Sequence, residues 1–256
     1  MMKYWIRRTV PVWVTIGFVI LWQLTCMALR IDSFILPSPV QVYHSLVQHH
    51  DPIMFHAMQT LFTTVVGFAI AVVFGLLLGL AIGVERAVYD GLYPLMISFN
   101  SIPKVAIVPL LVIWFGIGTV PAILTAFLIS FFPIVVNVAT GLATIEPELQ
   151  DVLRSLGARK RQIVLKIGIP RSMPYFFASL KVAITLAFIG SVVSESIASN
   201  SGIGYLMIAA SARFDVALVF AGFVVISVMG IIMYEITAYT ERRFTFWATR
   251  ANDVVT

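Results

Sequence analysis

Long runs of apolar residues, separated by short polar loops, restrict the fold of this chain more than any other feature. Six runs stand out, at 11–29, 58–84, 92–115, 120–142, 174–194 and 216–239. A helix needs about 20 apolar residues to cross the hydrocarbon core of a bilayer, so each run is long enough for one span. Only 11% of the 256 residues are charged, whereas soluble domains carry about 25%. The sequence therefore predicts an all-α, polytopic transmembrane helix bundle with about six spans.

The loops between the runs are too short to form a separate globular domain, so we expect one transmembrane domain over residues 1–256. Lys3, Arg7 and Arg8 precede the first run, as in a signal peptide. The run is longer than a signal peptide's apolar region and ends without a small-residue cleavage site. We therefore expect it to be an uncleaved membrane anchor.

The basic residues predict the orientation of the spans. Six spans place both termini on one side of the membrane. With that side cytoplasmic, the inner segments hold fourteen of the 17 lysines and arginines. The outer segments hold only Arg30 and Arg213, and Lys104 lies inside a run. This distribution obeys the positive-inside rule, so we expect cytoplasmic N- and C-termini.

Glycine and proline positions predict how some spans pack and bend. Gly75, Gly79 and Gly83 recur every four residues in the second run, a pattern that lets another helix approach closely. In the third run, Pro103 and Pro109 flank Lys104 and interrupt the helix.

Lys104 has two interpretations. A lysine inside the membrane is costly, so it is expected to line a translocation pathway or to extend to the cytoplasmic headgroups. In the second case the true span begins near Lys104, after an interfacial helix.

Four further residues are candidates for the pathway or its outer gate. Glu195 directly follows the fifth run, and an ionisable group at membrane depth faces a pathway or pairs with a structural partner. Asn137 is a polar residue inside the fourth run, where it lines the pathway or joins helices. Gly202 and Gly204 lie in a break between helices that predicts an irregular loop, either a gate or a surface turn.

The single sizeable inner loop, residues 144–171, predicts an amphipathic helix pair. Thr144 is expected to cap the first helix, and Gly157 is expected to end it in the left-handed conformation. One apolar stripe follows the helical period: Leu149, Val152, Leu153 and Leu156. A second, basic helix is expected to stop at Pro170. The pair is either an interfacial helix on membrane lipid or a docking surface for a soluble partner.

This loop resembles the coupling loop of binding-protein-dependent ABC importers. That loop has a Glu-Ala-Ala triplet, then Gly, nine residues, Ile, one residue, Leu and Pro. Gly157, Ile167 and Pro170 match the register, whereas Asp151, Val152 and Leu153 replace the triplet. The resemblance implies that these residues, with Leu149 and Leu156, contact an ATPase subunit.

Other segments resemble the nitrate, taurine and alkanesulfonate permease group. They are Leu36-Pro37-Ser38-Pro39, Ile102-Pro103-Lys104, Trp114-Phe115-Gly116-Ile117-Gly118, Phe132-Pro133-Ile134 with Asn137, and Glu195 followed by 201–206. The resemblance implies a type I ABC importer permease fold, a homodimer, two ATP-binding subunits and a periplasmic binding protein, in the bacterial inner membrane. The solute is then a small anion such as a sulfonate or nitrate.

Several other functions are disfavoured. The chain has no Gly-x-x-x-x-Gly-Lys-Ser/Thr, so we expect it to be a non-catalytic subunit, with ATP and Mg²⁺ bound by its partner. Its dispersed basic residues do not indicate nucleic-acid binding. His44, His49, His50 and His56 are expected to be solvated, with no metal site. The alternative that stays open is an ion-gradient-driven secondary transporter, which would use Glu195 and Glu235.

Overall fold

The computed structural model describes residues 2–143 and 147–245, and this part of the chain is almost entirely helical, without strands. The elements, in chain order, are α1 (Met2–Ala28), α2 (Pro39–Gln48), α3 (His50–Val84), α4 (Arg86–Ser101), the 3₁₀ helix η1 (Lys104–Ile107), α5 (Val108–Phe115), α6 (Thr119–Ala143), α7 (Pro147–Ser155), α8 (Lys160–Ile163), the π-helix η2 (Val164–Gly168), α9 (Ile169–Ala198), α10 (Ile203–Ala212) and α11 (Val216–Phe244).

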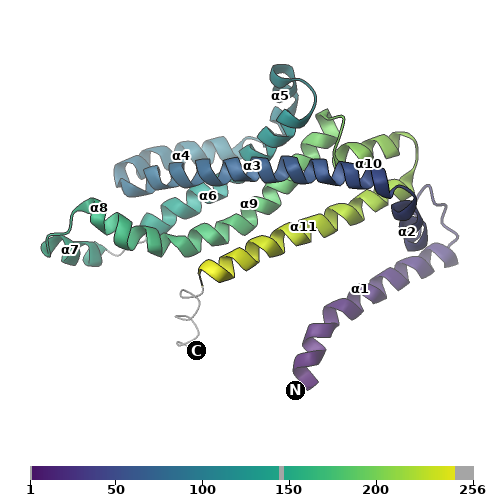
Figure 1. Ribbon diagram of the computed structural model, residues 1–256, viewed down its shortest axis with the longest axis horizontal. Helices are drawn as coiled ribbons and strands as arrows, with labels where there is room; N and C mark the ends of the chain where they lie inside the picture. The colour runs from purple at the N-terminus through teal and green to yellow at the C-terminus, as the bar shows by residue number, and fades with distance from the viewer. Residues whose placement is uncertain (1, 144–146, 246–256) are drawn as a thin grey trace.

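Helices α3, α6, α9 and α11 form the body of the molecule (Figure 1). Within the described residues, four helical stretches are long and apolar enough to cross a membrane: His50–Val84, Thr119–Ala143, Lys160–Ala198 and Val216–Phe244. The third predicted span is a fifth only as a broken pair, because Ala87–Ser101 and Lys104–Phe115 are bent by 74°. Pro103 explains this bend, since it cannot donate the backbone hydrogen bond that a continuous helix requires.

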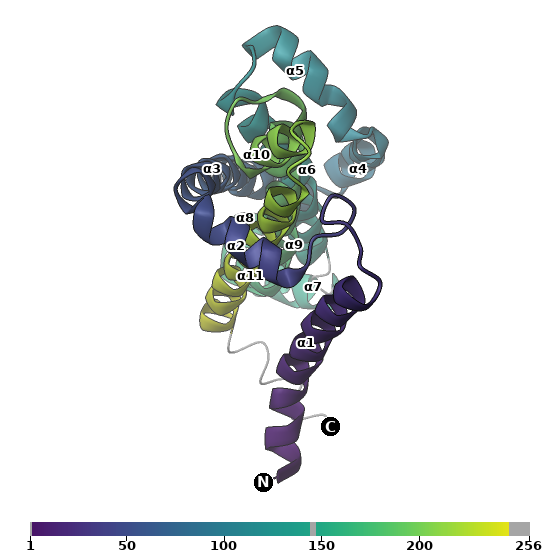
Figure 2. The ribbon, with the colours of Figure 1, turned by 90° about the vertical axis from the view of Figure 1, so that its right-hand side faces the viewer.

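The first predicted span corresponds to α1, in which Trp13–Ala28 is a shorter apolar helix. Figure 2 shows α1 diverging from the bundle, and Figure 1 shows α7 and α8 at the opposite end from α2 and α10. The side chains of α1 from Trp13 to Leu21 are exposed.

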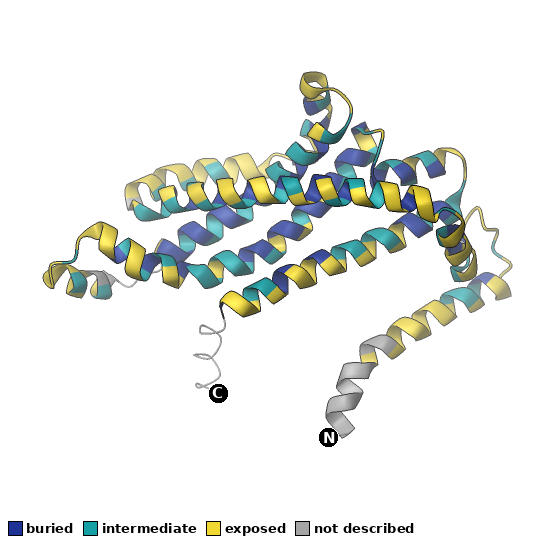
Figure 3. Cartoon of the chain, in the orientation of Figure 1, coloured by how far each residue is buried: buried dark blue, intermediate teal, exposed yellow. Residues whose placement is uncertain are grey.

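The core lies where α6 packs between α3 and α9, and the buried residues in Figure 3 gather along these helices. The predicted glycine pattern on α3 faces α6. A Cβ atom added at Gly79 would lie 2.8 Å from Val138 Cβ, and one at Gly75 would lie 2.9 Å from Ile134 Cβ. The prediction that these glycines allow close helix packing is confirmed, because larger side chains would push the two helices apart.

The inner loop differs from the prediction at Pro170. No helix stops there, since Lys160–Ala198 runs as one apolar helical stretch of 39 residues through η2. Pro170 lies in the first turn of α9, directly after the π-helix. The wider π-turn changes the hydrogen-bonding register, so the missing proline N–H is tolerated without ending the helix. Thr144, the predicted cap of the first helix, lies outside the described residues.

Candidate functional site

Three groups of residues carry the predicted functions, and they lie in different parts of the molecule. The first is the segment from α7 to η2 at one end of the bundle. The second is the bend between α4 and α5, where Lys104 lies. The third surrounds Glu195, where the loop between α9 and α10 meets α3.

The turn after α7 has the predicted geometry. Gly157 has φ +83°, the left-handed conformation that glycine adopts without strain. Its N–H donates to Arg154 O at 2.9 Å, and the N–H of Ala158 donates to Leu153 O at 2.9 Å. This paired arrangement satisfies two carbonyls at the end of the helix and turns the chain sharply towards α8.

The apolar stripe of α7 is largely uncovered. Leu156 is 78% exposed and Val152 is 56% exposed, while Leu149 and Leu153 are partly buried. Between the end of α7 and the start of the long helix lies a groove of about 300 Å³. Its lining residues are Leu153, Leu156, Gly157, Ala158, Gln162, Ile163, Lys166 and Ile167. We call this feature the α7–η2 groove. The structure thus brings Leu153, Leu156, Gly157 and Ile167 together, whereas Pro170 lies outside the groove lining.

An ion pair joins the same region to the first half of the bundle. Lys160 Nζ binds Glu85 Oε1, which lies between α3 and α4. A second pair, Lys181 Nζ to Glu241 Oε2 at 2.6 Å, joins α9 to α11. Both pairs link the long helix that begins at Lys160 to its neighbours.

Lys104 lies at the bend between α4 and α5 and is only 9% exposed. Its Nζ donates to Asn100 Oδ1 at 2.8 Å and to Asn100 O at 3.0 Å, and it lies 5.9 Å from the centre of the Phe99 ring. None of the ion pairs among the described residues involves Lys104. The bend therefore holds a buried ammonium group with neutral acceptors on two of its three donors.

Asn137 interacts with its own helix. Its Nδ2 donates to Pro133 O at 2.8 Å, within α6. This bond lies next to the proline that interrupts the backbone ladder of α6, and the side chain is partly buried.

Glu195 lies near the end of α9 and is 1% exposed. Its Oε2 accepts from Thr60 Oγ1 at 2.7 Å and from Gly204 N at 3.3 Å, and its Oε1 accepts from Thr63 Oγ1 at 3.0 Å. Ser191 Oγ donates to Thr63 Oγ1 at 2.6 Å. The sequence singled out Glu195 and Gly204, but not the hydroxyls of α3 that meet them.

His56 also differs from the prediction of solvated imidazoles. Its Nδ1 accepts a hydrogen bond from Gly202 N at 3.1 Å, and its side chain is partly buried. Among the described residues, no three histidine, cysteine or acidic side chains group as metal ligands. The functional partners His56, Thr60 and Thr63 follow one another at helical spacing on α3, a pattern that marks one polar stripe in an apolar span.

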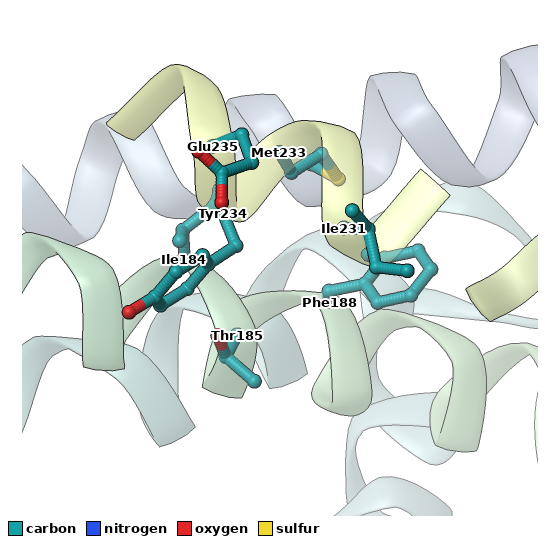
Figure 4. Close-up of a pocket in the computed structure, with 8 residues that line it drawn as sticks. Ile184, Thr185, Phe188, Ile231, Met233, Tyr234 and Glu235 are labelled. Carbon is teal, nitrogen blue, oxygen red and sulfur yellow. The ribbon is translucent and has the colours of Figure 1, made fainter. Parts of the chain in front are cut away.

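A further groove of about 340 Å³ lies between α9 and α11 (Figure 4). In this view Ile231 of α11 lies opposite Phe188 of α9, and Tyr234 of α11 lies beside Ile184 of α9. Met233 and Glu235 of α11 also line the groove. Of the residues that the sequence analysis singles out, Glu235, which the alternative of a secondary transporter would use, lines this groove.

A bundle of helices long and apolar enough to cross a membrane, with an exposed amphipathic segment at one end, is typical of a multi-pass membrane protein. Comparison with known proteins then identifies the family. Residues 71–246 match the family described as binding-protein-dependent transport system inner membrane component, and the chain belongs to this family.

Two relatives and one solved structure illustrate the similarity. The formylaminopyrimidine transport permease protein ThiX of Halalkalibacterium halodurans is 30% identical over 229 residues, covering 89% of this chain and 91% of ThiX. The taurine transport system permease protein TauC of Escherichia coli is 28% identical over 233 residues, covering 88% of this chain and 84% of TauC.

The structural match is to an inward-facing conformation of the MetNI methionine ABC transporter. The TM-score is 0.66 at 20% sequence identity, over 76% of this chain and 96% of the matched chain. The expected type I ABC importer permease fold is therefore confirmed. Family membership makes the chain a non-catalytic permease component of an ABC importer in the inner membrane, and it argues against a secondary transporter.

Proposed function

We propose that two copies of this chain form the translocation pathway of an ATP-driven importer for a small anionic solute. Two ATP-binding subunits hold ATP and Mg²⁺, bind the α7–η2 groove of each copy and drive the conformational change. A periplasmic binding protein delivers the solute to the other side. The chain has cytoplasmic N- and C-termini in this arrangement and binds no cofactor itself.

The observation that carries this proposal is the exposure of the α7–η2 groove. A short helix at the polar end of a membrane bundle would normally bury its apolar stripe, yet Leu156 and Val152 lie open. The basic side chains beside them, such as Lys166, keep the segment on the cytoplasmic side under the positive-inside rule. An exposed apolar groove with a charged rim is typical of a protein docking surface.

The geometry also favours a protein partner over a lipid surface. The left-handed turn at Gly157 folds α7 back against α8, so that Leu153 and Leu156 line a concave groove together with Ile163 and Ile167. A helix that lies on lipid presents a continuous apolar face to the membrane. A groove instead fits a complementary ridge on a soluble subunit.

Co-purification with the ATP-binding subunit tests this assignment. We expect Leu156→Ser to reduce recovery of that subunit about tenfold, because truncating a central apolar contact costs more than about 1 kcal/mol. Leu165→Ser is the matched control, since Leu165 is an exposed leucine of η2 that does not line the groove. Equal recovery with both variants, at equal membrane expression, would exclude the groove as the docking surface.

The anionic solute is inferred from Lys104. A buried ammonium that has only neutral acceptors retains its positive field, and an anion passing the bend between α4 and α5 would complete its third hydrogen bond. The resemblance to taurine and alkanesulfonate permeases supports the same class of solute. Asn137, Gly202 and Gly204 are proposed to act on the pathway and its outer gate.

A further inference from the structure

The N-terminus of α10 is capped entirely by side chains of other helices. Gly202 precedes α10 and has no side chain with which to cap it. Three consecutive backbone N–H groups nevertheless have acceptors. Gly202 N donates to His56 Nδ1 at 3.1 Å, Ile203 N to Thr60 Oγ1 at 2.8 Å, and Gly204 N to Glu195 Oε2 at 3.3 Å.

Glu195 joins these contacts into one unit. The Thr60 hydroxyl that accepts from Ile203 also donates to Glu195, and Thr63 donates to the other carboxyl oxygen. The carboxyl group therefore bonds α3 at two points and α10 at one, from its position on α9. Its oxygens also face the N-terminal end of α10, where the helix dipole favours an acceptor.

The loop sequence fits this contact closely. Gly202 has φ +100°, and a Cβ atom there would overlap the Glu195 carboxyl group. A Cβ atom at Gly204 would lie 3.0 Å from Glu195 Cβ and would overlap Val192 O. The two glycines are thus required by the close approach of Glu195 as well as by the turn.

Glu195 lies near the end of the same helix whose beginning lines the α7–η2 groove. Lys160–Ala198 is one helical stretch, and its beginning contributes Ile163, Lys166 and Ile167 to the α7–η2 groove. Its 39 residues span about 58 Å at 1.5 Å per residue, so one element connects the groove to α10. Figure 1 shows α7 and α8 at one end of the molecule and α10 at the other.

We propose that Glu195 is a positioning residue that fixes α10 to α9 and α3, so that α10 moves with the long helix as the outer cap of the pathway. Glu195 acts through its hydrogen bonds and does not contact the solute. The anchoring stands on the contacts alone, whereas its role in transport rests on the proposed function.

Cysteine labelling of α10 tests the anchoring in the chain itself. A Leu206→Cys reporter is placed in a Cys26→Ser background, in membrane vesicles. Leu206 is buried in the first turn of α10. We expect Glu195→Ala to raise the labelling rate by a water-soluble maleimide about tenfold, since loss of buried hydrogen bonds favours local opening. Thr60→Val, which removes no carboxyl group, should have the same direction of effect.

Glu195→Gln separates positioning from a need for the carboxyl charge. The amide nitrogen can donate to Thr63 Oγ1, because the Thr63 hydroxyl lies 3.0 Å from Thr60 O and can donate there instead. The amide oxygen still accepts from Thr60 and Gly204. We therefore expect labelling near the unsubstituted rate. Glu235→Ala, which removes an exposed carboxyl group of α11, is the control and should leave labelling unchanged.

The amount of solute imported per ATP hydrolysed distinguishes loss of positioning from general destabilisation of the chain, which would lower import and ATP hydrolysis together. In the assembled importer, Glu195→Ala should lower solute imported per ATP hydrolysed at least about fivefold, with ATP hydrolysis retained, and Glu195→Gln should restore the ratio. Unchanged Leu206→Cys labelling in Glu195→Ala and Thr60→Val would overturn the anchoring. Equal loss of import in the alanine and glutamine variants would instead assign Glu195 a direct role in the pathway. Failure of every chain to import with ATP, with the labelling pattern intact, would contradict only the proposed function.

Discussion

Lys104 shows how one residue at a helix break determines the local electrostatics of a membrane protein. The proline before it ends α4, and the ammonium folds back to Asn100 on the preceding turn. These bonds stabilise the charge without neutralising it, because both acceptors are uncharged. The snorkelling alternative stays open, because the separate helix α4 before the bend is also what that alternative expects.

The anion hypothesis predicts that Lys104→Gln lowers uptake of an anionic solute about 10- to 100-fold, the effect of losing one charge-assisted hydrogen bond. ATP hydrolysis stimulated by the binding protein should persist, since Lys104 is far from the α7–η2 groove in sequence and structure. Uptake into vesicles measures the effect. Lys104→Arg is the control and should retain most of the uptake, because it keeps the charge. Wild-type uptake by the glutamine variant would show that no anion depends on this ammonium.

Single residues were predictable only where the signal was local. Gly157 has its expected left-handed conformation because the end of an amphipathic helix and a glycine are adjacent in the sequence. The partners of Glu195 were not predictable, since Thr60 and Thr63 precede it by 135 and 132 residues. The sequence predicts that His56 is solvated like the other three histidines, because it does not reveal that the backbone at Gly202 bonds to His56.

At the scale of elements, the turn between α7 and α8 determines the shape of the proposed docking groove. Gly157→Val should reorient α7, because a β-branched residue pays about 1–2 kcal/mol or more in the left-handed conformation. We expect the chain to insert normally and to bind the ATP-binding subunit at least about fivefold less well. Gly157→Asn should bind nearly normally, since asparagine tolerates this conformation. The measurement is co-purification at matched expression, and equal binding by all three chains would contradict the expectation.

The packing of α3 on α6 gives a prediction about stability. Gly79→Ala places a methyl group 2.8 Å from Val138 Cβ and 3.0 Å from Val135 O, so we expect a loss of about 1–3 kcal/mol from overpacking. Gly91→Ala is the matched control, because nothing lies within 4 Å of its added Cβ. Thermal unfolding in detergent distinguishes the two. A melting temperature at least as low for Gly91→Ala would show that the contact with α6 is not the cause.

The sequence predicts some helices better than others. Apolar runs and the glycine repeat predicted α3, α6 and α11 and the close approach of α3 to α6, because both signals are periodic along one helix. The prolines of the third run predict where the helix breaks, but they do not predict the 74° angle between its two halves. The prediction that a helix ends at Pro170 is wrong, because the π-helix η2 directly before it lets the helix continue through the proline.

The whole molecule places its two specialised regions at opposite ends of one long helix. The α7–η2 groove lies where Lys160–Ala198 begins, and the Glu195 contacts lie where it ends. The ion pair of Lys160 with Glu85 joins the start of that helix to the turn between α3 and α4, and the pair of Lys181 with Glu241 joins its middle to α11. Under the proposed function, a force applied at the groove would reach the Glu195 contacts through the covalent structure of this one helix.

In the proposed importer this chain forms the pathway and a separate subunit hydrolyses ATP. The rate of ATP hydrolysis tests this assignment most directly. The purified chain in lipid nanodiscs is assayed alone, with the ATP-binding subunit added, and as Leu156→Ser with the same subunit. Because the sequence has no phosphate-binding loop, we expect no hydrolysis by the chain alone. Hydrolysis should become responsive to the binding protein only when the unsubstituted chain and the subunit are combined. Robust ATP turnover by the chain alone, or an unchanged response with the Leu156→Ser variant, would contradict the assignment.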